Sequence, residues 1–265
     1  AAQSLGAERY RIEAVLPGSA PRAREFRVEV IRQKYRIMFL AGRPSAEYAQ
    51  LREFLKSDPN HELVSFVILR NPDNPSFVAD HELSLIPFPA DEIFVNSLNQ
   101  FDLFILENFS YAKFRLPTSY LESLKAFVAN GGALLVIGGE NAFGLGGYRG
   151  TPVEEMLPVT LAASAADFSA GLFSPKPAAK GHPLVRLYDT AEASQAAWEA
   201  LPELDGFAHF SSVRPGATVL AVHPQERTTD GQPLPVLAIR EYGRGKVMLV
   251  SSDSTWRWRL GAAAD

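Results

Sequence analysis

Residues 134–152, LLVIGGENAFGLGGYRGTP, decide the fold of this chain. The stretch opens with an apolar run at 134–137 that is short and branched enough to be a buried strand. Five glycines then fall within ten residues, and glycine tolerates positive φ and lets a backbone approach another group closely. Thr151 and Pro152 predict a helix start, with Thr as N-cap and Pro at the first helical position. The stretch therefore predicts a strand, a glycine loop and a helix.

The glycine loop is the first candidate for a ligand site. Open α/β sheets usually bind ligands where a buried strand ends at its carboxyl side. A tight, irregular crossover without a ligand fits the pattern equally well. The spacing matches neither the phosphate-binding loop nor the dinucleotide fingerprint. If the loop binds a ligand, the contacting residues we expect are Arg43, Gly138, Gly139, Glu140, Asn141, Gly146, Gly147, Tyr148 and Ser254.

Composition places the chain among ordinary globular proteins. It has 265 residues, of which 46% are hydrophobic and 21% charged. A net charge of −4 disfavours a nucleic-acid surface, which usually shows a basic excess. No apolar run approaches the roughly 20 residues that cross a bilayer, so we expect no membrane insertion by this segment. The N-terminus lacks the apolar core of a signal peptide.

The chain contains no cysteine. Disulfides, thiolate metal sites and cysteine nucleophiles are therefore excluded. The chain begins without Met and ends in GAAAD just after an apolar and aromatic run, so we expect it to be part of a longer protein.

The N-terminal half predicts alternating strands and helices. The apolar runs 35–41, 63–69 and 101–106 predict buried strands. Ser45 predicts the cap of a helix through Lys56, so residues 35–69 form a β-α-β unit with parallel strands. A second helix is expected from Thr118, as its cap, to Asn130, with Asn130-Gly131-Gly132 as a left-handed end. The fold class is accordingly α/β, with a mostly parallel sheet flanked by helices.

The remaining segments give weaker predictions. Alternation at 10–15 and 26–31 predicts two strands, which we interpret as the tail of a preceding β-rich segment covering residues 1–32. Residues 70–90 are expected to form a long surface loop, and 91–98 a short helix. After a short helix and strand from Val153, residues 162–180 and 198–210 predict no regular element. The expected strands near the C-terminus are 217–222, 236–242 and 246–252, the last two forming an antiparallel hairpin with a three-residue loop at 243–245.

Acidic and polar residues follow several of the expected strands. If these strands are parallel, their carboxyl ends share one edge and bring together Arg43, Glu47, Glu107, Glu140, Asn141 and residues 253–255. Glu47, Glu107, Glu140 and Asp253 are the catalytic candidates, since such a cluster suits acid/base chemistry or a hard metal ion. Arg–carboxylate pairs at strand ends also commonly hold loops in place, and this alternative stays open.

The other reactive residue types give no motif. None of the five histidines has zinc-ligand spacing, and His182 and His223 each precede proline, which favours loops. No serine lies in a nucleophile elbow of the Gly-x-Ser-x-Gly type. Residues 256–259, WRWR, predict either an aromatic face packed inward, which we favour, or a cation–π pair at an interface.

Three separated motifs carry a resemblance to a known family. GRPSAEY at 42–48, LLVIGGENAFGLGGYRGTPVEEMLPV at 134–159 and GRGKVMLVSSDSTWRW at 243–258 resemble the glutamine amidotransferase-like domain of large bacterial membrane-anchored proteins. The resemblance covers roughly residues 30–260 and implies a class I amidotransferase-like, flavodoxin-like fold over residues 33–265, preceded by an Ig-like segment. Class I amidotransferases use a Cys nucleophile with His and Glu partners. The nucleophile position falls at Gly138-Gly139-Glu140, and the His position offers residues 253–256, so the triad is absent.

The function we expect follows from this loss of catalytic groups. The leading hypothesis is a non-catalytic module that binds a ligand or a protein within a larger bacterial membrane-associated protein. The alternatives are a hydrolase that uses the carboxylate cluster, with or without a divalent metal, and a structural spacer. We expect no cofactor. The resemblance implies partners within the same parent protein, among them a von Willebrand factor A-type domain, and an envelope location with the extracytoplasmic side favoured.

Overall fold

The computed structural model describes residues 6–14, 22–30, 34–68, 89–114, 116–163 and 167–262. Its centre is an eight-stranded sheet in the order β4-β3-β5-β6-β14-β13-β12-β9. The pairs from β4 to β14 are parallel and those from β14 to β9 are antiparallel. In sheet order the strands are β4 (His61–Val67), β3 (Tyr35–Ala41), β5 (Leu103–Glu107), β6 (Ala133–Ile137), β14 (Gly245–Val250), β13 (Pro233–Tyr242), β12 (Ala217–Arg227) and β9 (Lys176–Pro177). The predicted α/β class with a mostly parallel sheet is confirmed.

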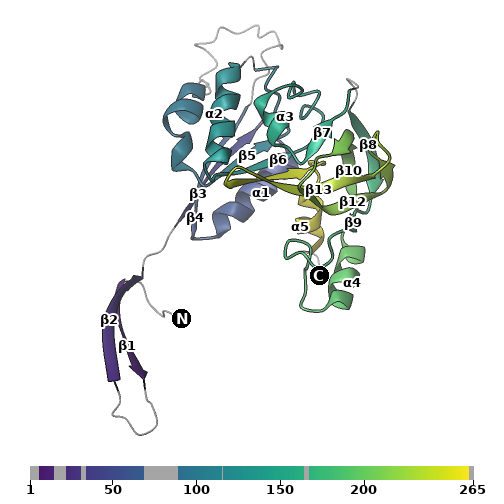
Figure 1. Ribbon diagram of the computed structural model, residues 1–265. Coiled ribbons are helices and arrows are strands. Elements are labelled where there is room, and N and C mark those ends of the chain that lie inside the picture. Colours follow the sequence, from purple (N-terminus) through teal and green to yellow (C-terminus); the bar gives the residue numbers. More distant parts are fainter. Residues whose placement is uncertain are drawn as a thin grey trace.

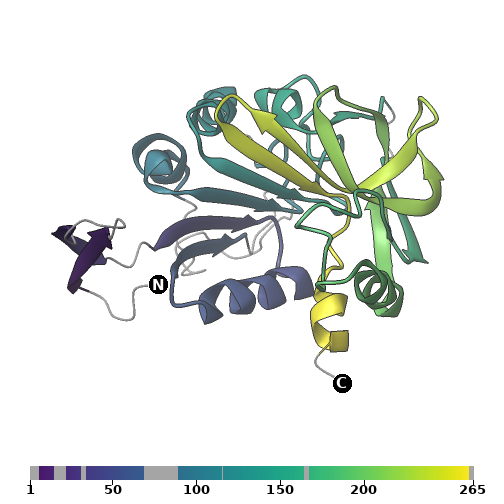
Figure 2. The same cartoon turned by 60° about the horizontal axis from the view of Figure 1, so that its bottom comes forward.

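Helices cover both faces of the parallel half (Figures 1 and 2). In Figure 2, α1 (Ala46–Ser57) lies on one face, while α2 (Thr118–Ala129) and the π-helical turn η1 (Glu92–Asn96) lie on the other. The central strands are therefore buried on both sides, and Phe39, Leu40 and Phe104 are fully buried. This accounts for their continuous apolar sequences. The remaining helices are the 3₁₀ turn η2 (Leu98–Gln100), α3 (Pro152–Met156), α4 (Ala191–Ala200) and α5 (Trp256–Ala262).

The helix ends show which capping predictions hold. Ser45 caps α1, its hydroxyl oxygen accepting the Tyr48 N–H at 2.9 Å, as predicted. The left-handed end of α2 is also confirmed: Gly131 has φ +118°, and the Gly132 N–H donates to the Phe127 carbonyl at 3.1 Å. The predicted cap of α2 is wrong. Extended Pro117 takes the N-cap position with no side-chain cap, and Thr118 is the first helical residue.

The start of α3 combines a confirmed prediction with a different hydrogen-bond pattern. Thr151 is the N-cap and Pro152 follows it, as predicted. The Thr151 hydroxyl donates backwards to the Tyr148 carbonyl at 2.7 Å and so caps no helical N–H. The Glu154 carboxylate instead accepts from the Gly150 and Leu161 N–H groups, at 2.7 and 3.0 Å. One buried carboxylate thus holds the glycine loop, the helix and the next strand together.

The C-terminal half contains elements that the sequence did not predict. Residues 162–180 and 198–210 supply β8 (Phe168–Phe173), β9, β10 (Leu204–Ala208) and part of β11 (Phe210–Val213). β10 pairs with β8, and β11 pairs with β7 (Val159–Leu161). β10 carries a register shift between Asp205 and Phe207, and Gly206 within it has φ +75°, so it lacks the regular alternation that identifies a strand.

Two further predictions in this half need correction. His223, expected in a loop, is buried in β12, with its ring 4.5 Å from the Phe173 ring and 4.4 Å from the Phe207 ring. The β13–β14 hairpin is present, but Tyr242 pairs with Gly245. The turn therefore has two residues, Gly243 and Arg244, and Gly245 already belongs to the strand.

The N-terminal residues form a hairpin of β1 (Gly6–Ala14) and β2 (Arg22–Val30), which confirms two strands there. The hairpin lies away from the eight-stranded sheet in Figure 1 and pairs with no strand of it that the structure describes. The domain boundary near residue 32 remains a prediction. Of the loop predicted at 70–90, residues up to 88 lie outside the described residues. The described parts contain no helix that is long and apolar enough to cross a membrane.

Truncating a buried leucine of β14 tests how much this central strand contributes to the stability of the fold. Leu249 is fully buried, so Leu249→Ala should lower the free energy of unfolding by about 2–5 kcal/mol through lost burial and a cavity. Leu172 in β8 is 58% exposed, and Leu172→Ala should change it by less than about 0.5 kcal/mol. Urea unfolding of both variants measures the difference. Equal effects would mean that β14 is not a core strand.

Candidate functional site

The parallel strands end in register. Across the sheet, Ala41 is paired with Glu107, Glu107 with Ile137, and Ile137 with Val250. The residues that follow each strand therefore meet at one edge, as the sequence predicts. The ladder continues one residue further, since the Gly42 N–H donates to the Glu107 carbonyl and the Gly138 N–H to the Val250 carbonyl, at 2.9 and 2.8 Å.

The first two glycines of the loop are required by close backbone contacts. A Cβ atom on Gly138 would lie 2.4 Å from the Ser251 carbonyl oxygen. Gly139 has φ +129°, and a Cβ there would lie 2.4 Å from Cγ of Asn108. Side chains are therefore excluded where β6 leaves the sheet. These glycines serve the packing of strand ends, and neither contributes to the wall of the cavity described below.

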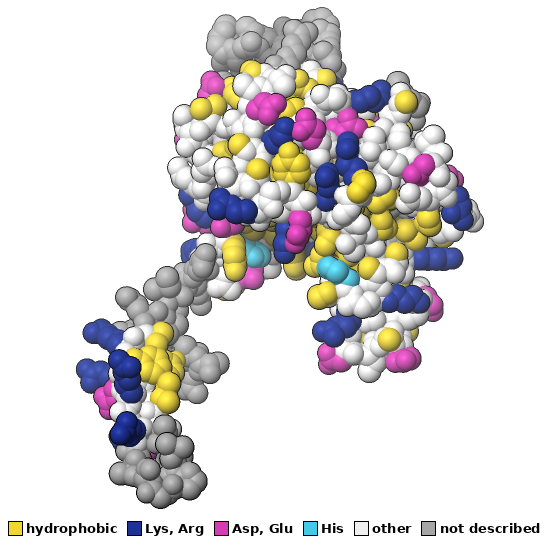
Figure 3. Space-filling view, in the orientation of Figure 1, with side chains coloured by type: hydrophobic (Ala, Val, Ile, Leu, Met, Phe, Trp, Pro, Cys, Tyr) yellow, Lys and Arg dark blue, Asp and Glu magenta, His cyan; other side chains and the backbone are white. Residues whose placement is uncertain are grey.

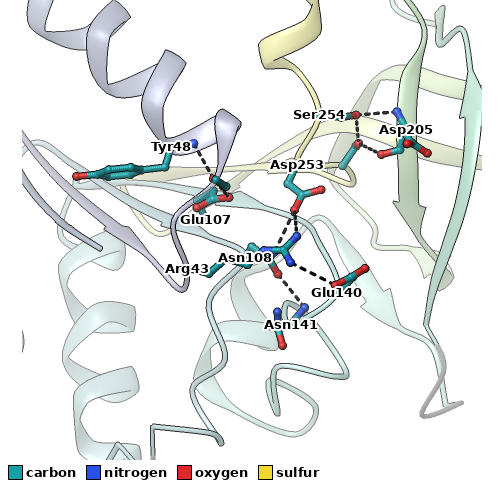
Figure 4. Close-up of polar contacts among 11 residues, drawn as sticks. Arg43, Tyr48, Glu107, Asn108, Glu140, Asn141, Asp205, Asp253 and Ser254 are labelled. Carbon is teal, nitrogen blue, oxygen red and sulfur yellow. Dashed lines mark hydrogen bonds and ion pairs between the residues drawn. The ribbon is translucent and has the colours of Figure 1, made fainter. Parts of the chain in front are cut away.

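Arg43 connects two of the candidate carboxylates (Figure 4). Its guanidinium lies 3.3 Å from Oε2 of Glu140 and 3.4 Å from Oδ2 of Asp253. Glu140 is well exposed, whereas the Asp253 side chain is only 13% exposed. Burial raises the pKa of Asp253, and the Arg43 charge opposes that rise. Arg43 thus pairs with both carboxylates, and its charge favours the ionised form of the partly buried Asp253.

Asn108 is a site residue that the sequence analysis missed. It has φ +43°, a left-handed conformation that asparagine tolerates better than most residues. Its side-chain amide donates to Oδ2 of Asp253 at 3.0 Å and accepts the Asn141 N–H at 2.8 Å. Asn108 therefore joins the ends of β5, β6 and β14. Its place directly after a strand, next to Glu107, was the signal for it in the sequence.

Glu47 has a structural role at this edge. It is 2% exposed, and its carboxylate accepts the Thr255 hydroxyl and, at 2.9 Å, the Trp256 N–H. Burial raises the pKa of Glu47, while the hydrogen bond from Thr255 lowers it. Both oxygens are engaged at the start of α5. Glu47 therefore ties α1 to α5 and does not face open space.

Glu107 is the most perturbed of the candidate acids. It is fully buried, its Oε1 accepts the Ser45 hydroxyl at 3.0 Å, and its Oε2 has no partner among the described residues. Burial raises the pKa of Glu107 to about 8, the nearby Asp253 and Glu47 charges add to the rise, and the Ser45 hydrogen bond opposes it. At neutral pH Glu107 is thus mostly a neutral carboxylic acid.

A cavity of about 330 Å³ opens beside this edge. Of the predicted residues, Arg43, Glu140, Asp253 and Ser254 line it. The structure places the other predicted residues outside its wall: Glu47, Glu107, Gly138, Gly139, Asn141, Gly146, Gly147 and Tyr148. The further lining residues come from α1 and its cap, from β8 and β10, and from the start of α5; they are Pro44, Ser45, Ala46, Phe168, Ala170, Asp205, Gly206, Trp256 and Arg257.

The far end of the glycine loop turns into the core. Tyr148 is 1% exposed, and its ring stacks on Tyr111 with centroids 6.2 Å apart. Burial raises the pKa of Tyr148, whose hydroxyl has no hydrogen-bond partner among the described residues. A Cβ on Gly147 would lie 2.4 Å from Cβ of Ala112. The second half of the loop therefore packs beneath the segment after β5.

Two oppositely charged side chains in the cavity have no salt-bridge partner. Arg257 lies over the Trp256 ring, 5.8 Å from its centroid, and Asp205 accepts the Gly171 N–H at 3.2 Å. Neither forms an ion pair with any residue that the structure describes. The WRWR motif contained a signal for Arg257 and Trp256. Asp205 lies in a segment that predicted no element, so nothing in the sequence marked it.

Among the described residues, neither the Ser254 hydroxyl nor a histidine forms a nucleophile–base pair at the cavity. The Ser254 hydroxyl accepts the Asp205 N–H at 2.8 Å and lies 2.8 Å from the Ser252 hydroxyl. No histidine is among the cavity-lining residues. Within the described ranges, no three His, Asp or Glu side chains are grouped so that they could hold a metal ion. Within the WRWR motif, Trp258 packs inward against Trp198 at 5.9 Å, as favoured, while Trp256 lines the cavity beneath Arg257; the predicted interface remains a prediction.

The raised pKa of Glu107 makes the stability of the protein depend on pH. The protonated acid favours the folded state, so its contribution is complete below about pH 4.5 and is lost as pH rises through about 8. Between these values the loss is up to about 1.4 kcal/mol per pH unit. Glu107→Gln should therefore lose less unfolding free energy than the wild type between pH 5 and pH 8.5, in urea titrations.

Glu122→Gln, a change at an exposed position of α2, is the matched control and should follow the wild-type pH profile. Parallel profiles for the wild type and Glu107→Gln would show that Glu107 is ionised in the folded protein at neutral pH.

Comparison with known proteins identifies the family. A family model described as "Putative glutamine amidotransferase" matches residues 89–264. No curated protein matches this chain. Two solved structures from Salmonella typhimurium share the fold. The cytoplasmic protein STM1381 is 17% identical, with a TM-score of 0.58 over 97% of this chain and 92% of its own. The cytoplasmic protein STM3548 is 19% identical, with a TM-score of 0.53 over 93% of this chain and 85% of its own.

These identities are low enough that the solved structures show the fold alone. The family match covers well over half of the chain and includes the glycine loop, β14 and the start of α5. It includes two of the three motifs on which the resemblance rests, those at 134–159 and 243–258, and the chain belongs to the glutamine amidotransferase-like family.

Proposed function

We propose that this domain is a non-catalytic ligand-binding module of a larger bacterial membrane-associated protein, and that its cavity binds a small zwitterion such as an α-amino acid. The observation that carries the proposal is the pair of unpartnered opposite charges, Arg257 and Asp205, on the wall of one cavity. A ligand with both a carboxylate and an ammonium group would neutralise both at once.

The charges of the cavity favour this ligand class. Arg43 is already neutralised by Glu140 and Asp253, so Arg257 is the guanidinium available to a ligand carboxylate. Guanidinium groups bind carboxylates with two parallel hydrogen bonds, and these charge-assisted bonds are the strong ones. The Trp256 ring beneath Arg257 restricts that side chain, which lowers the entropy cost of binding. A volume of about 330 Å³ suits a ligand of amino-acid size.

The absence of nucleophilic chemistry supports a binding role. Hydrolysis of glutamine by the class I mechanism needs an activated cysteine, and the chain has none. At the equivalent position after β6 stand Gly138, Gly139 and Glu140, and the Glu140 carboxylate pairs with Arg43. Of the two serines in the cavity wall, Ser254 is held by neighbouring groups, and Ser45 caps α1 while its hydroxyl donates to the buried Glu107. The polar groups at the carboxyl edge of the parallel strands are thus engaged with one another and hold that edge together.

The placement of this domain in a parent protein rests on the sequence resemblance. The three motifs are those of a domain found in large bacterial membrane-anchored proteins, where a von Willebrand factor A-type domain often accompanies it. We propose that ligand binding at the cavity is communicated to such neighbouring domains of the parent protein.

Ligand binding is tested by a thermal-shift screen with amino acids, their N-acetyl and amide derivatives, nucleotides and sugars. A zwitterion at a hundredfold excess over its dissociation constant should stabilise the fold by about 2.7 kcal/mol. Derivatives that lack either charge should bind more weakly. Arg257→Gln and Asp205→Asn should each weaken binding of a hit by about 10- to 150-fold, because each removes one charge-assisted hydrogen bond.

Lys246→Gln, at an exposed position of β14, removes a charge outside the cavity and should leave binding unchanged. Hits confined to uncharged sugars, or equal binding by the two cavity variants and the control, would exclude the zwitterion proposal.

A hydrolase based on carboxylates is the second candidate. One observation favours it: burial raises the pKa of Glu107 to about 8, and Asp253 lies close enough to add to that rise; two carboxyl groups in different environments are an arrangement used in general acid–base catalysis. Its weakness is geometric, since Glu107 is fully buried and does not line the cavity. The described residues also offer no metal-binding group to assist it.

Turnover measurements decide between binding and catalysis. We expect no ammonia release from glutamine and no hydrolysis of ester or glycoside substrates by the purified protein between pH 6 and pH 9. Turnover that disappears in both Glu107→Gln and Asp253→Asn, while circular dichroism shows an intact fold, would establish the hydrolase instead.

A further inference from the structure

A second cavity lies at the other end of the antiparallel half, between α4 and the segment 177–189. Its volume is about 470 Å³. Its floor is apolar: Val185 and Trp198 line it and are 2% and 5% exposed. The Trp198 indole N–H donates to the Val185 carbonyl at 2.8 Å, which fixes the indole in place. The floor is therefore a rigid surface that a further apolar side chain could contact.

The rim of this cavity carries four unpaired charges. Lys180 and Arg186 supply two cations, and Asp189 and Glu192 supply two anions, all exposed. None of the four forms an ion pair with another described residue. Figure 3 shows basic and acidic side chains gathered on the lobe that α4 belongs to. The rim has no net charge, so it would attract neither a polyanion nor a polycation.

The same segment also exposes large apolar side chains. Leu184, Leu187 and Tyr188 are 55%, 45% and 61% exposed, and they flank the buried Val185 and the rim residue Arg186. A short stretch of chain thus contains both an apolar hollow and protruding apolar side chains. Such a pairing on neighbouring residues is what a two-fold contact requires, because each surface patch must then complement itself.

We infer that this surface is a contact between two copies of the chain. In a two-fold dimer, apolar side chains from residues 184–188 of each copy enter the cavity of the other. The cations Lys180 and Arg186 of one copy face the anions Asp189 and Glu192 of its partner. An apolar centre with a charged rim is the usual composition of a protein interface. With two cations and two anions on one patch, the rim can complement its own charges, and this favours a second copy as the occupant.

Charge reversal provides the test, using the full chain and sedimentation equilibrium over a range of protein concentrations. The wild type should form a dimer with a dissociation constant in the micromolar range, as expected for a small interface. Lys180→Glu/Arg186→Glu makes all four rim charges negative, and Asp189→Lys/Glu192→Lys makes all four positive. Each variant alone should dimerise about 100-fold more weakly or worse, since like charges then face each other. A one-to-one mixture of the two should form a heterodimer.

Lys56→Glu/Lys246→Glu is the matched control, because it reverses two exposed cations outside this cavity. It should dimerise like the wild type. Three results would overturn the inference: a wild type that is monomeric at every concentration, equal weakening in the control, or a mixture of the two rim variants that stays monomeric. The first would leave the cavity to an occupant other than a second copy.

Discussion

The alignment of the four strand ends is the constraint on which the rest of this structure depends. Parallel pairing with Ala41, Glu107, Ile137 and Val250 in one row fixes where four connecting segments leave the sheet. A shift of one residue in any strand would turn its side chains to the opposite face and move the following loop. Both faces are buried under helices, so such a shift would place apolar side chains wrongly throughout the core. The polar groups at the edge are therefore brought together by the register of a hydrophobic sheet.

Bringing these groups together buries carboxylates, and the energetic penalty of that burial shows in their raised pKa values. Glu47, Glu107 and Asp253 are all more buried than surface carboxylates, and burial raises the pKa of each. The structure compensates for the burial of these carboxylates in three different ways. Glu47 is hydrogen-bonded at the start of α5, Asp253 lies beside Arg43 and Asn108, and Glu107 stays protonated near neutral pH. Buried polar groups retain their hydrogen-bond requirements, and at this edge they meet them largely with one another.

The cavity exists because the antiparallel half supplies its second wall. The parallel half alone provides Arg43, Glu140 and Asp253, one guanidinium paired with two carboxylates. β8 and β10 add Phe168 and Asp205, and the start of α5 adds Trp256 and Arg257. The Asp205 backbone is held by Ser254, just after β14, so the two halves are joined at the cavity itself. Asp205 and Arg257 have no ion-pair partner among the described residues, which distinguishes them from the ion-paired Arg43, Glu140 and Asp253.

The sequence by itself determined the parallel half and its edge. The run at 134–137 is apolar throughout and that at 35–41 nearly so, and each is followed by glycine, so local signals agree with the final fold. It did not identify β8, β9 or β10, because these strands are short or carry a bulge, nor α4, in which only Ser194 and Trp198 are buried. Such elements are stabilised by tertiary contacts and lack periodicity of their own.

The residues of the candidate site also divide into those that the sequence predicts and those that only the structure identifies. Arg43, Glu140 and Asp253 could be predicted as neighbours, because the carboxyl ends of parallel strands must meet. The burial of Glu107 and Tyr148, the bridging role of Asn108 and the presence of Asp205 could not be predicted, because each depends on which neighbour shields or faces the side chain. The sequence predicted the β-α-β unit, the C-terminal hairpin and which residues follow the strands, whereas the order of the strands came from the structure. Only the tertiary structure decided which of those residues stay in contact with solvent, since burial is set by residues distant in the chain.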